Sequence, residues 1–263
     1  MARSDRGRNL LTSWQTWALV GVLFVLIVLV LWYALENPRN QTFGNTVTQV
    51  PVKQKVVALT FDDGPNPPYT DEIVDYLHAQ HVPATFFVVG RAVVQHPESV
   101  RKEAQDGDAI GNHSWDHAHL VLERRPHIAR EISMTDAAIQ RATGVKTRLF
   151  RPPFGARDYA VISVARHMGY QVIMWSVPLP KDWSSPPPSV IRDRVLPYVK
   201  DGSIIVLHDG NRGMPGDRSS TVAATKLIVE ALRAQGYWFV TVPELLRLGY
   251  LEHQSGASPS APE

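Results

Sequence analysis

The chain has 263 residues, a length that fits one large or two small domains. Apolar residues make up 44% and charged residues 20%, values that exclude wholesale disorder. The formal net charge of +2 is too small to indicate a nucleic-acid binder. The absence of cysteine excludes a disulfide scaffold, a thiolate metal site and a cysteine nucleophile, so any metal must be held by nitrogen and oxygen ligands.

An apolar segment near the N-terminus, residues 17–35, contains no charged or amide side chain. At about 1.5 Å per residue, a helix of this length spans the hydrocarbon core of a bilayer. Three arginines precede the segment and only Arg39 follows closely, so the positive-inside rule places residues 1–16 in the cytoplasm. We therefore expect a single-pass transmembrane helix in the cytoplasmic membrane, with the remaining chain extracytoplasmic. A cleaved signal peptide is the alternative, although its apolar region is usually shorter.

The rest of the chain divides by composition into three parts. Residues 36–54 are polar, contain Pro38 and Pro51 and show no periodicity, so we expect a flexible linker there. Residues 55–251 contain enough apolar and periodic sequence for one globular domain, which we expect there. Residues 252–263 are expected to be a disordered, low-complexity tail.

Within the predicted domain, short β-branched or apolar runs alternate with stretches of helical periodicity. The predicted strands are residues 56–60, 85–89, 109–112, 149–151, 172–175, 204–208 and 238–241. The predicted helices are residues 69–81, 92–106, 126–143, 159–167, 190–199 and 221–235. This alternation indicates a parallel sheet with crossover helices. It favours a compact, distorted (β/α)7 barrel, with a doubly wound open sheet as the alternative.

Nearly every reactive side chain follows one of the predicted strands. The motifs are TFDDGP at 60–65, HSWDH at 113–117, RPPFG at 151–155, DW at 182–183 and VLHDG at 206–210. Because the carboxyl ends of parallel strands converge on one face of a barrel, we expect these residues to meet in one cleft.

A metal site is the first chemistry that the motifs indicate. His113 and His117 are separated by three residues, a spacing that directs both imidazoles toward a common point. Asp62 or Asp63 is the natural carboxylate ligand to complete the set. Two histidines and one carboxylate leave coordination positions open to water, which is the catalytic pattern for zinc. On spacing alone, an exposed histidine pair is the alternative.

The remaining candidates also have purely structural interpretations. Asp62 and Asp63 precede a Gly-Pro pair and could form an ordinary acidic turn. His208 follows an apolar strand and could be a neutral core imidazole, while Arg151 could pair with a surface carboxylate. Trp183 could belong to the core, or it could stack on a sugar ring. The residue types therefore leave both readings open at each position.

The five motifs, in this order and in a seven-stranded α/β pattern, resemble the polysaccharide deacetylases of carbohydrate esterase family 4, which share a NodB-like domain. The resemblance covers residues 55–248. It implies a metal-dependent hydrolase that removes acetyl groups from sugars. It also implies the distorted (β/α)7 barrel of that family.

The resemblance assigns a role to each catalytic candidate. Asp62 is expected to be the general base, and Arg151 is expected to orient it. His208 is expected to be the general acid, tuned by Asp182. The backbone N–H of Phe154 is expected to contribute to an oxyanion hole.

The resemblance also implies the metal ligands and the substrate pocket. The ligands of a divalent cation, Zn²⁺ with Co²⁺ or Mn²⁺ as alternatives, are expected to be Asp63, His113 and His117. The pocket is expected to be lined by Pro153, Trp183, Val206 and Leu207. Two features depart from the family pattern: the loop after Trp175 is one residue longer than usual, and Val206 stands where leucine is common.

These observations predict a membrane-anchored deacetylase of an N-acetylated extracytoplasmic polysaccharide. Peptidoglycan is the expected substrate, because a domain on a short tether reaches the wall first. The alternatives are a chitooligosaccharide N-deacetylase, an O-acetyl esterase of the same fold, and a non-catalytic glycan-binding module. The expected partners are the glycan and, through residues 17–35, the membrane. No nucleic-acid or protein partner is expected.

Overall fold

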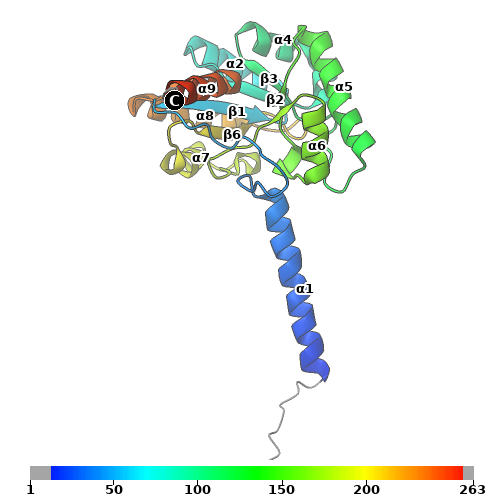
Figure 1. Cartoon of the computed structure of the whole chain (residues 1–263). Helices are drawn as coiled ribbons and strands as arrows, with labels where there is room; N and C mark the ends of the chain where they lie inside the picture. Colours follow the sequence, from blue (N-terminus) through cyan, green and yellow to red (C-terminus); the bar gives the residue numbers. More distant parts are fainter. Residues whose placement is uncertain (1–12, 257–263) are drawn as a thin grey trace, which may run out of the picture.

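The computed structural model describes residues 13–256. Its centre is a curled, fully parallel sheet of seven strands, as predicted (Figure 1). The strand order is β5-β4-β3-β2-β1-β6, and β7 pairs with the first residues of β1. The strands are β1 (Val56–Asp62), β2 (Thr85–Val88), β3 (Ala109–Asn112), β4 (Leu149–Phe150), β5 (Gln171–Val172), β6 (Ile204–His208) and β7 (Trp238–Phe239).

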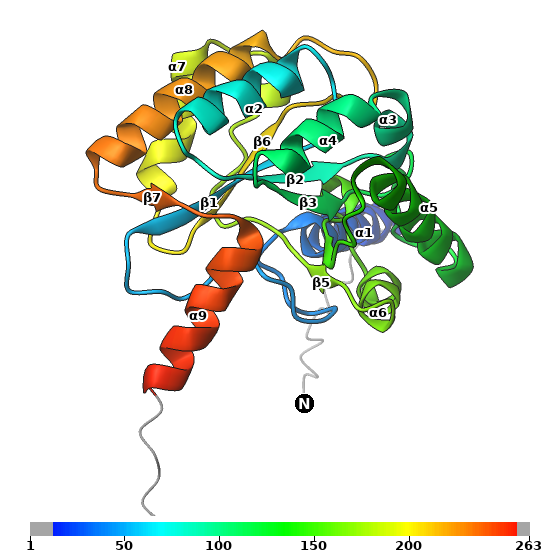
Figure 2. The same ribbon diagram turned by 90° about the horizontal axis from the view of Figure 1, so that it is seen from above.

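Helices cover the outside of the curl. Figure 2 shows α2, α4, α7 and α8 over one face of the sheet, with α5 and α6 beyond β3 and β5. The helices are α1 (Ser13–Glu36), α2 (Tyr69–Ala79), α3 (Gly90–Gln95), α4 (Pro97–Gln105), α5 (Arg125–Thr143), α6 (Tyr159–His167), α7 (Pro188–Val195), α8 (Ser219–Ala234) and α9 (Val242–Gly256). Three short 3-10 turns are η1 (Pro153–Gly155), η2 (Asp182–Ser184) and η3 (Leu196–Tyr198). Consecutive strands from β1 to β5 are neighbours, which excludes the doubly wound alternative.

Alternation along β1 separates the two sides of the sheet. Leu59 and Phe61 pack with residues of α2 and α8 in one buried cluster, whereas Val56 and Ala58 pack in a second cluster on the inner side of the curl. Because side chains alternate along a strand, Asp62 at the end of β1 follows the inner side. The strand therefore delivers its last carboxylate to the interior of the curl.

The segment predicted as a flexible linker, residues 36–54, packs partly against the domain. Val47 forms a parallel bridge with Ile173, and Gln49 forms an antiparallel bridge with Ser203. The N–H of Val50 donates to the carbonyl of Gly202 at 3.0 Å. These contacts lie between β5 and β6, the two edge strands, so the segment fills the gap in the curled sheet. Periodicity could not reveal this, because the pairing partners lie more than a hundred residues away.

A buried arginine ties the residues after α1 to the domain. Arg157 is 1% exposed, and its Nη2 donates to the carbonyls of Asn37 at 2.7 Å and Pro38 at 3.0 Å. Its Nη1 donates to the carbonyl of Gly155 at 2.9 Å, next to Phe154. Burial lowers the pKa of Arg157 to about 10, so the side chain remains cationic at neutral pH. Carbonyl dipoles near the carboxyl end of α1 thus stabilise a buried cation.

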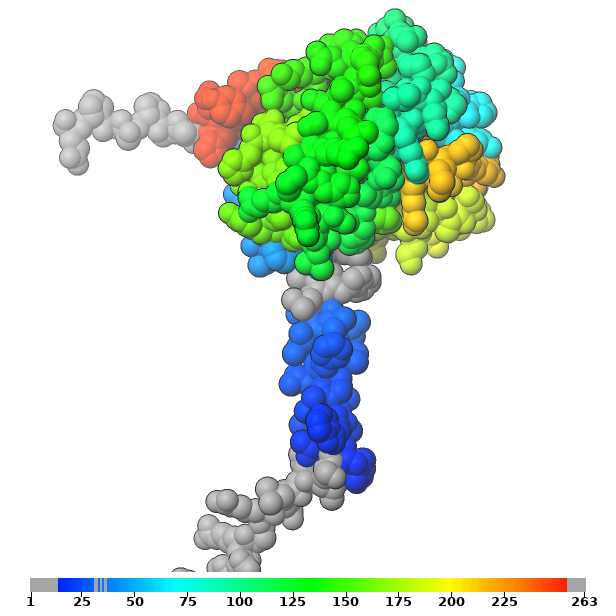
Figure 3. All heavy atoms as spheres, turned by 90° about the vertical axis from the view of Figure 1, so that its right-hand side faces the viewer, coloured from blue at the N-terminus to red at the C-terminus, as the bar shows by residue number. Residues whose placement is uncertain are grey.

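Helix α1 projects from the domain as a stalk, and its carboxyl end contacts η1 (Figure 3). Many of its described side chains are apolar and exposed, among them Leu23, Phe24 and Val30. Counting only the described residues, no helix combines the length and hydropathy needed to cross a membrane. The transmembrane helix expected over residues 17–35 is therefore not confirmed and stays a prediction.

Several helix boundaries differ from the predictions, and the helix expected over residues 190–199 ends at Val195 and is followed by η3. The helix expected over residues 92–106 is divided at His96 into α3 and α4, because Pro97 cannot continue the hydrogen bonding of the preceding helix. Helix α9 was not predicted, and it continues to Gly256, beyond the expected domain end at residue 251. Residues 1–12 and 257–263, which include most of the predicted N-terminal and C-terminal tails, lie outside the described residues.

The packing of residues 36–54 predicts that a protein beginning at Lys55 is less stable than one beginning at Asn37. The shorter protein loses the Val47 and Val50 pairings and leaves Arg157 without three of its acceptors, the carbonyls of Asn37, Pro38 and Asn40. Each buried polar group left unpaired costs about 1–3 kcal/mol. Urea unfolding monitored by circular dichroism measures the difference, and equal unfolding midpoints would contradict the packing role of this segment.

Candidate active site

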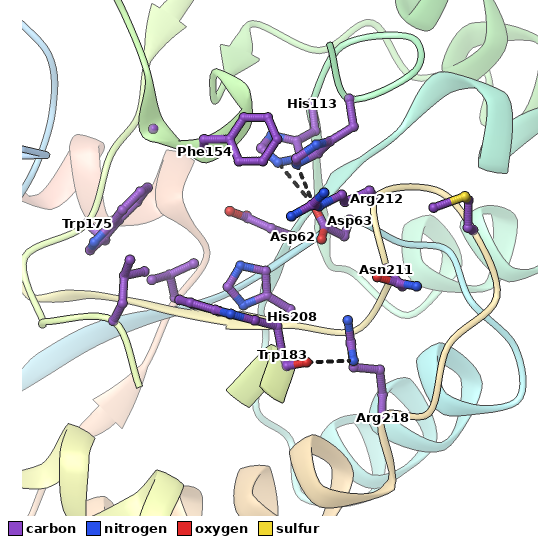
Figure 4. A pocket seen from close by; sticks show the side chains of 15 residues that line it. Asp62, Asp63, His113, Phe154, Trp175, Trp183, His208, Asn211, Arg212 and Arg218 are labelled. Carbon is purple, nitrogen blue, oxygen red and sulfur yellow. Dashed lines mark hydrogen bonds and ion pairs between the residues drawn. The ribbon is translucent and has the colours of Figure 1, made fainter. Parts of the chain in front are cut away.

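A cavity of about 360 Å³ opens at the carboxyl ends of the strands (Figure 4). Residues from β1, β6 and the loops after β3, β4, β5 and β6 surround it, as expected for converging parallel strands. Its lining residues are Asp62, Asp63, His113, His117, Phe154, Gly155, Trp175, Leu179, Trp183, Val206, His208, Asn211, Arg212, Met214 and Arg218.

Arg151 holds the first carboxylate of the site. Its guanidinium is fully buried, and Nη1 donates to Asp62 Oδ1 at 2.6 Å and to Thr60 Oγ1 at 2.8 Å. The other guanidinium nitrogens donate to the carbonyls of Ile173 and Met174. Oδ1 of Asp62 is therefore fixed in a charge-assisted hydrogen bond, and Asp62 still lines the cavity. This arrangement excludes the surface ion pair considered for Arg151.

Asp63, His113 and His117 form a compact buried cluster. Asp63 Oδ1 lies 3.0 Å from His117 Nε2 and 3.5 Å from His113 Nε2. Nδ1 of His113 lies 2.7 Å from the carbonyl oxygen of Arg151, which can only accept, so Nδ1 donates to that carbonyl and Nε2 faces Asp63. Asp63 and His117 both have positive φ values, 79° and 62°, which aim their side chains at each other at some conformational cost.

The cluster fits a divalent cation. One oxygen and two nitrogen ligand atoms lie within 4.8 Å of one another, and Asp63 Oδ1 is buried without a hydrogen-bond donor. Burial raises the pKa of Asp63, but the adjacent imidazoles of His113 and His117 outweigh it and hold the pKa well below its usual range. Burial lowers the pKa of His117 despite the opposing charge of Asp63. Ionised carboxylate and neutral imidazole are the forms that bind metals.

His208 lies across the cavity from this cluster and is paired with Asp182. Its Nδ1 lies 2.9 Å from Asp182 Oδ1, and its backbone N–H donates to Asp182 Oδ2 at 2.7 Å. Thr221 also donates to Oδ2, at 3.1 Å. Burial lowers the pKa of His208, but Asp182 first, and then Asp63 and Asp62, raise it to about 9. The imidazole is therefore cationic at neutral pH, unlike the neutral core histidine considered from the sequence.

The predicted substrate-pocket residues are only partly brought together. Val206 lines the cavity, and Trp183 lines it with its ring 5.0 Å from the His208 ring. Leu207 does not line the cavity, because alternation along β6 turns it to the outer cluster under the helices. Pro153 is buried in η1 and does not line the cavity either.

Two glycines allow the ends of β1 and β6 to approach closely. A Cβ on Gly64 would lie 2.0 Å from Asp209 Oδ2, and one on Gly210 would lie 2.2 Å from the backbone of Asp63. Asp209 itself is buried and accepts a hydrogen bond from Thr70 at 2.5 Å. In the sequence, both DDG and HDG end in an Asp-Gly pair, which is consistent with this close contact. An Asp-Gly pair is also typical of an ordinary turn.

The loop after β6 contributes lining residues that the sequence did not identify. Asn211, Arg212, Met214 and Arg218 all face the cavity. The intervening Gly and Pro residues indicate only a loop, and no periodicity specifies which of its side chains turn inward.

Comparison with known proteins identifies relatives of this chain. A family model described as polysaccharide deacetylase matches residues 49–173. A peptidoglycan-N-acetylglucosamine deacetylase of Bacillus cereus is 38% identical over 205 residues, covering 78% of this chain and 94% of that protein. The peptidoglycan-N-acetylmuramic acid deacetylase PdaC of Bacillus subtilis is 37% identical over 211 residues, covering 80% of this chain and 43% of that longer protein. A crystal structure of a peptidoglycan N-acetylglucosamine deacetylase, bound to a hydroxamate-type benzamide, superposes with a TM-score of 0.72 at 30% identity, covering 77% of this chain and 92% of that one.

The geometry predicts that Asp62 and Asp63 differ in metal binding. Asp63→Asn removes the charged ligand between the two imidazoles, so we expect metal content to fall well below one ion per chain. Asp62→Asn leaves the cluster intact and should keep wild-type content. Elemental analysis after dialysis against limiting Zn²⁺ measures both variants, and equal loss in the two would show that the carboxylates are not divided in this way.

The Asp182 contact predicts the titration of His208. Without the carboxylate charge, the imidazolium loses its main stabilising partner, so in Asp182→Asn the proton should leave about 1–3 pH units lower than in the wild type. NMR titration of the His208 ring signals in metal-free protein measures the shift. Asp193→Asn, a surface change of the same charge, is the matched control. An unchanged titration in Asp182→Asn would exclude Asp182 as the tuning partner.

Proposed function

The chain belongs to the polysaccharide deacetylase family and is a hydrolase of the deacetylase type, and we propose that it removes N-acetyl groups from the sugars of peptidoglycan. The observation that carries the proposal is one cavity with Asp62 on one side and cationic His208 on the other, flanking a cation site. The similarity to peptidoglycan deacetylases supports the choice of polymer.

Asp62 is placed to accept a proton from the attacking water. Its Oδ1 accepts a hydrogen bond from Arg151, so the carboxylate is held in one orientation. As the water oxygen bonds to the acetyl carbon, the proton passes to Asp62 and negative charge develops on the carbonyl oxygen. Phe154 lies at the cavity with φ at 61°, and we propose that its N–H donates to that oxygen.

His208 is placed to complete the reaction. When the carbon–nitrogen bond breaks, the departing amine nitrogen needs a proton, because an amide anion is a very poor leaving group. His208 is protonated at neutral pH and is held by Asp182, so it can donate that proton. Positioned proton transfer of this kind contributes roughly 10²–10⁴-fold to the rate.

The donor set of Asp63, His113 and His117 suits Zn²⁺, with Co²⁺ or Mn²⁺ as alternatives. A divalent cation bound there would polarise the acetyl carbonyl and lower the pKa of nearby water. The role of the protein is to supply these three ligands and to keep them buried together.

We further propose that the protein is anchored in the cytoplasmic membrane with its N-terminus inside. Support comes from the uncharged run of residues 17–35 and the arginines before it. Exposed apolar side chains along α1, such as Leu23 and Phe24, are costly in water. An outward-facing domain would then meet the wall.

The proposed function predicts acetate release from N-acetylated peptidoglycan fragments by the purified full-length protein, abolished by a chelator and restored by Zn²⁺. His208→Ala should slow the release roughly 10²–10⁴-fold. His127→Ala, a half-exposed histidine outside the cavity, should leave the rate unchanged. O-acetylated fragments assayed in parallel separate amide from ester cleavage. Absence of acetate from every N-acetylated fragment would contradict the proposal.

The proposed anchor predicts that the protein sediments with membranes and resists extraction by salt and alkaline carbonate. Protease added outside the cytoplasmic membrane should then remove the domain. N-terminal sequencing of the cell-associated protein is the deciding measurement, because a mature chain that starts near Glu36 would show that the segment is a cleaved signal peptide.

A further inference from the structure

The loop between β6 and α8, residues 209–218, places one arginine at the cavity. Arg212 lines the cavity beside Asn211, and its guanidinium carbon lies 5.1 Å from the centroid of the Phe154 ring. Figure 4 shows its side chain reaching toward Asp63. The His117 ring meets the same phenyl ring edge to face, with 4.5 Å between the centroids. Arg212 therefore stands immediately beside the predicted cation site, and it is accessible to a ligand.

The backbone holds Arg212 in this place. The N–H of Gly213 donates to the carbonyl of Asp63 at 3.0 Å, and Arg91 Nη2 donates to the carbonyl of Arg212 at 2.6 Å. Arg212 has a positive φ of 53°, which is uncommon for a residue with a side chain. The peptide group between Arg212 and Gly213 is thus held at both its carbonyl and its N–H, and a residue of positive φ held in this way near a functional site indicates a positioned side chain.

Arg212 has no carboxylate partner among residues 13–256, where the arginine ion pairs are those of Arg151, Arg192 and Arg247. Within the cavity, Asp62 is paired with Arg151, and Asp63 lies between two histidines. The positive charge of Arg212 is thus not balanced by a carboxylate, and a divalent cation at the Asp63 cluster would add further positive charge to the cavity. A planar guanidinium with free donors is the preferred protein partner of a carboxylate.

We propose that Arg212 determines substrate specificity by binding a carboxylate carried on the substituent at ring carbon 3 of the N-acetylated sugar. The proposal rests on the proposed function. The acetamido group is on ring carbon 2, so a sugar whose acetyl carbonyl meets the Asp63 cluster presents its carbon-3 substituent directly beside it. A lactyl ether at carbon 3, as in N-acetylmuramic acid, brings a carboxylate there, whereas N-acetylglucosamine has only a hydroxyl.

The carboxylate has two possible sources, the lactyl group itself or an acidic residue of a peptide attached to it. Four substrates that share one disaccharide core separate them. The first has a free carbon-3 hydroxyl, the second a lactyl carboxylate, the third the neutral lactyl amide, and the fourth a lactyl-linked dipeptide ending in an acidic residue. The amide is the matched control, because it keeps the shape and removes the charge.

The experiment measures kcat and KM of the full-length, Zn²⁺-loaded protein for the four substrates. The wild type should prefer at least one carboxylate substrate over the amide by about tenfold in kcat/KM, the ratio that 1.4 kcal/mol produces. Arg212→Gln should lose that preference through KM, and an unchanged circular dichroism spectrum and melting temperature would show that it is folded. Arg212→Lys should keep part of the preference. Arg141→Gln, an exposed arginine on α5, should behave as wild type.

Two results overturn the proposal. One is a wild-type carboxylate-to-amide ratio near one. The other is an Arg212→Gln variant that slows all four substrates equally, which would assign Arg212 to the reacting carbonyl and not to specificity.

Calorimetric dissociation constants for the same ligands separate this proposal from the proposed function. If no substrate releases acetate, the proposed function has failed, but a carboxylate preference in binding that disappears in Arg212→Gln still supports the subsite. Equal binding constants for the carboxylate and amide ligands overturn it.

Discussion

The buried guanidinium of Arg151 is the contact on which the site depends. It joins Asp62 at the end of β1 to the backbone that follows β5, through the carbonyls of Ile173 and Met174. Its own carbonyl orients the His113 ring, so one residue positions both the expected base and a metal ligand. A buried cation is stable only when its donors are satisfied, and removal of one partner of such a pair is costly. The contacts of Arg151 on the inner side of the curl therefore fix the positions of Asp62 and His113 together.

Much of this site could be predicted from the sequence because most of its residues lie at the carboxyl ends of predicted strands. Asp62, Asp63, His113, His117 and His208 follow or end predicted strands, and the geometry of a parallel sheet brings such residues together. Asp182 reaches His208 even though its loop is one residue longer than expected, because the 3-10 turn η2 places it there. Their catalytic roles stay predictions from the family resemblance.

The features that the sequence could not predict depend on contacts between distant segments. The inward turn of Arg212 follows from a hydrogen bond between Gly213 and Asp63, and the pairing of Val47 follows from a gap between two edge strands. Neither contact leaves a periodic pattern in its own segment. Leu207 differs for a local reason, since alternation along β6 turns its side chain to the outer face of the sheet.

The docking of residues 36–50 changes how the proposed anchor would act. A flexible linker would let the domain sample all orientations, but here Arg157 binds the carbonyls of Asn37 and Pro38, and Val47 and Val50 pair with the sheet edges. The domain is therefore held close to the end of α1 in a defined orientation. Arg157 also donates to Gly155, beside Phe154, so the same side chain joins the attachment to the proposed oxyanion loop. In a membrane-anchored protein, this arrangement would restrict the cavity to glycan strands near the membrane surface, and any change that released the segment would also disturb the loop that carries Phe154.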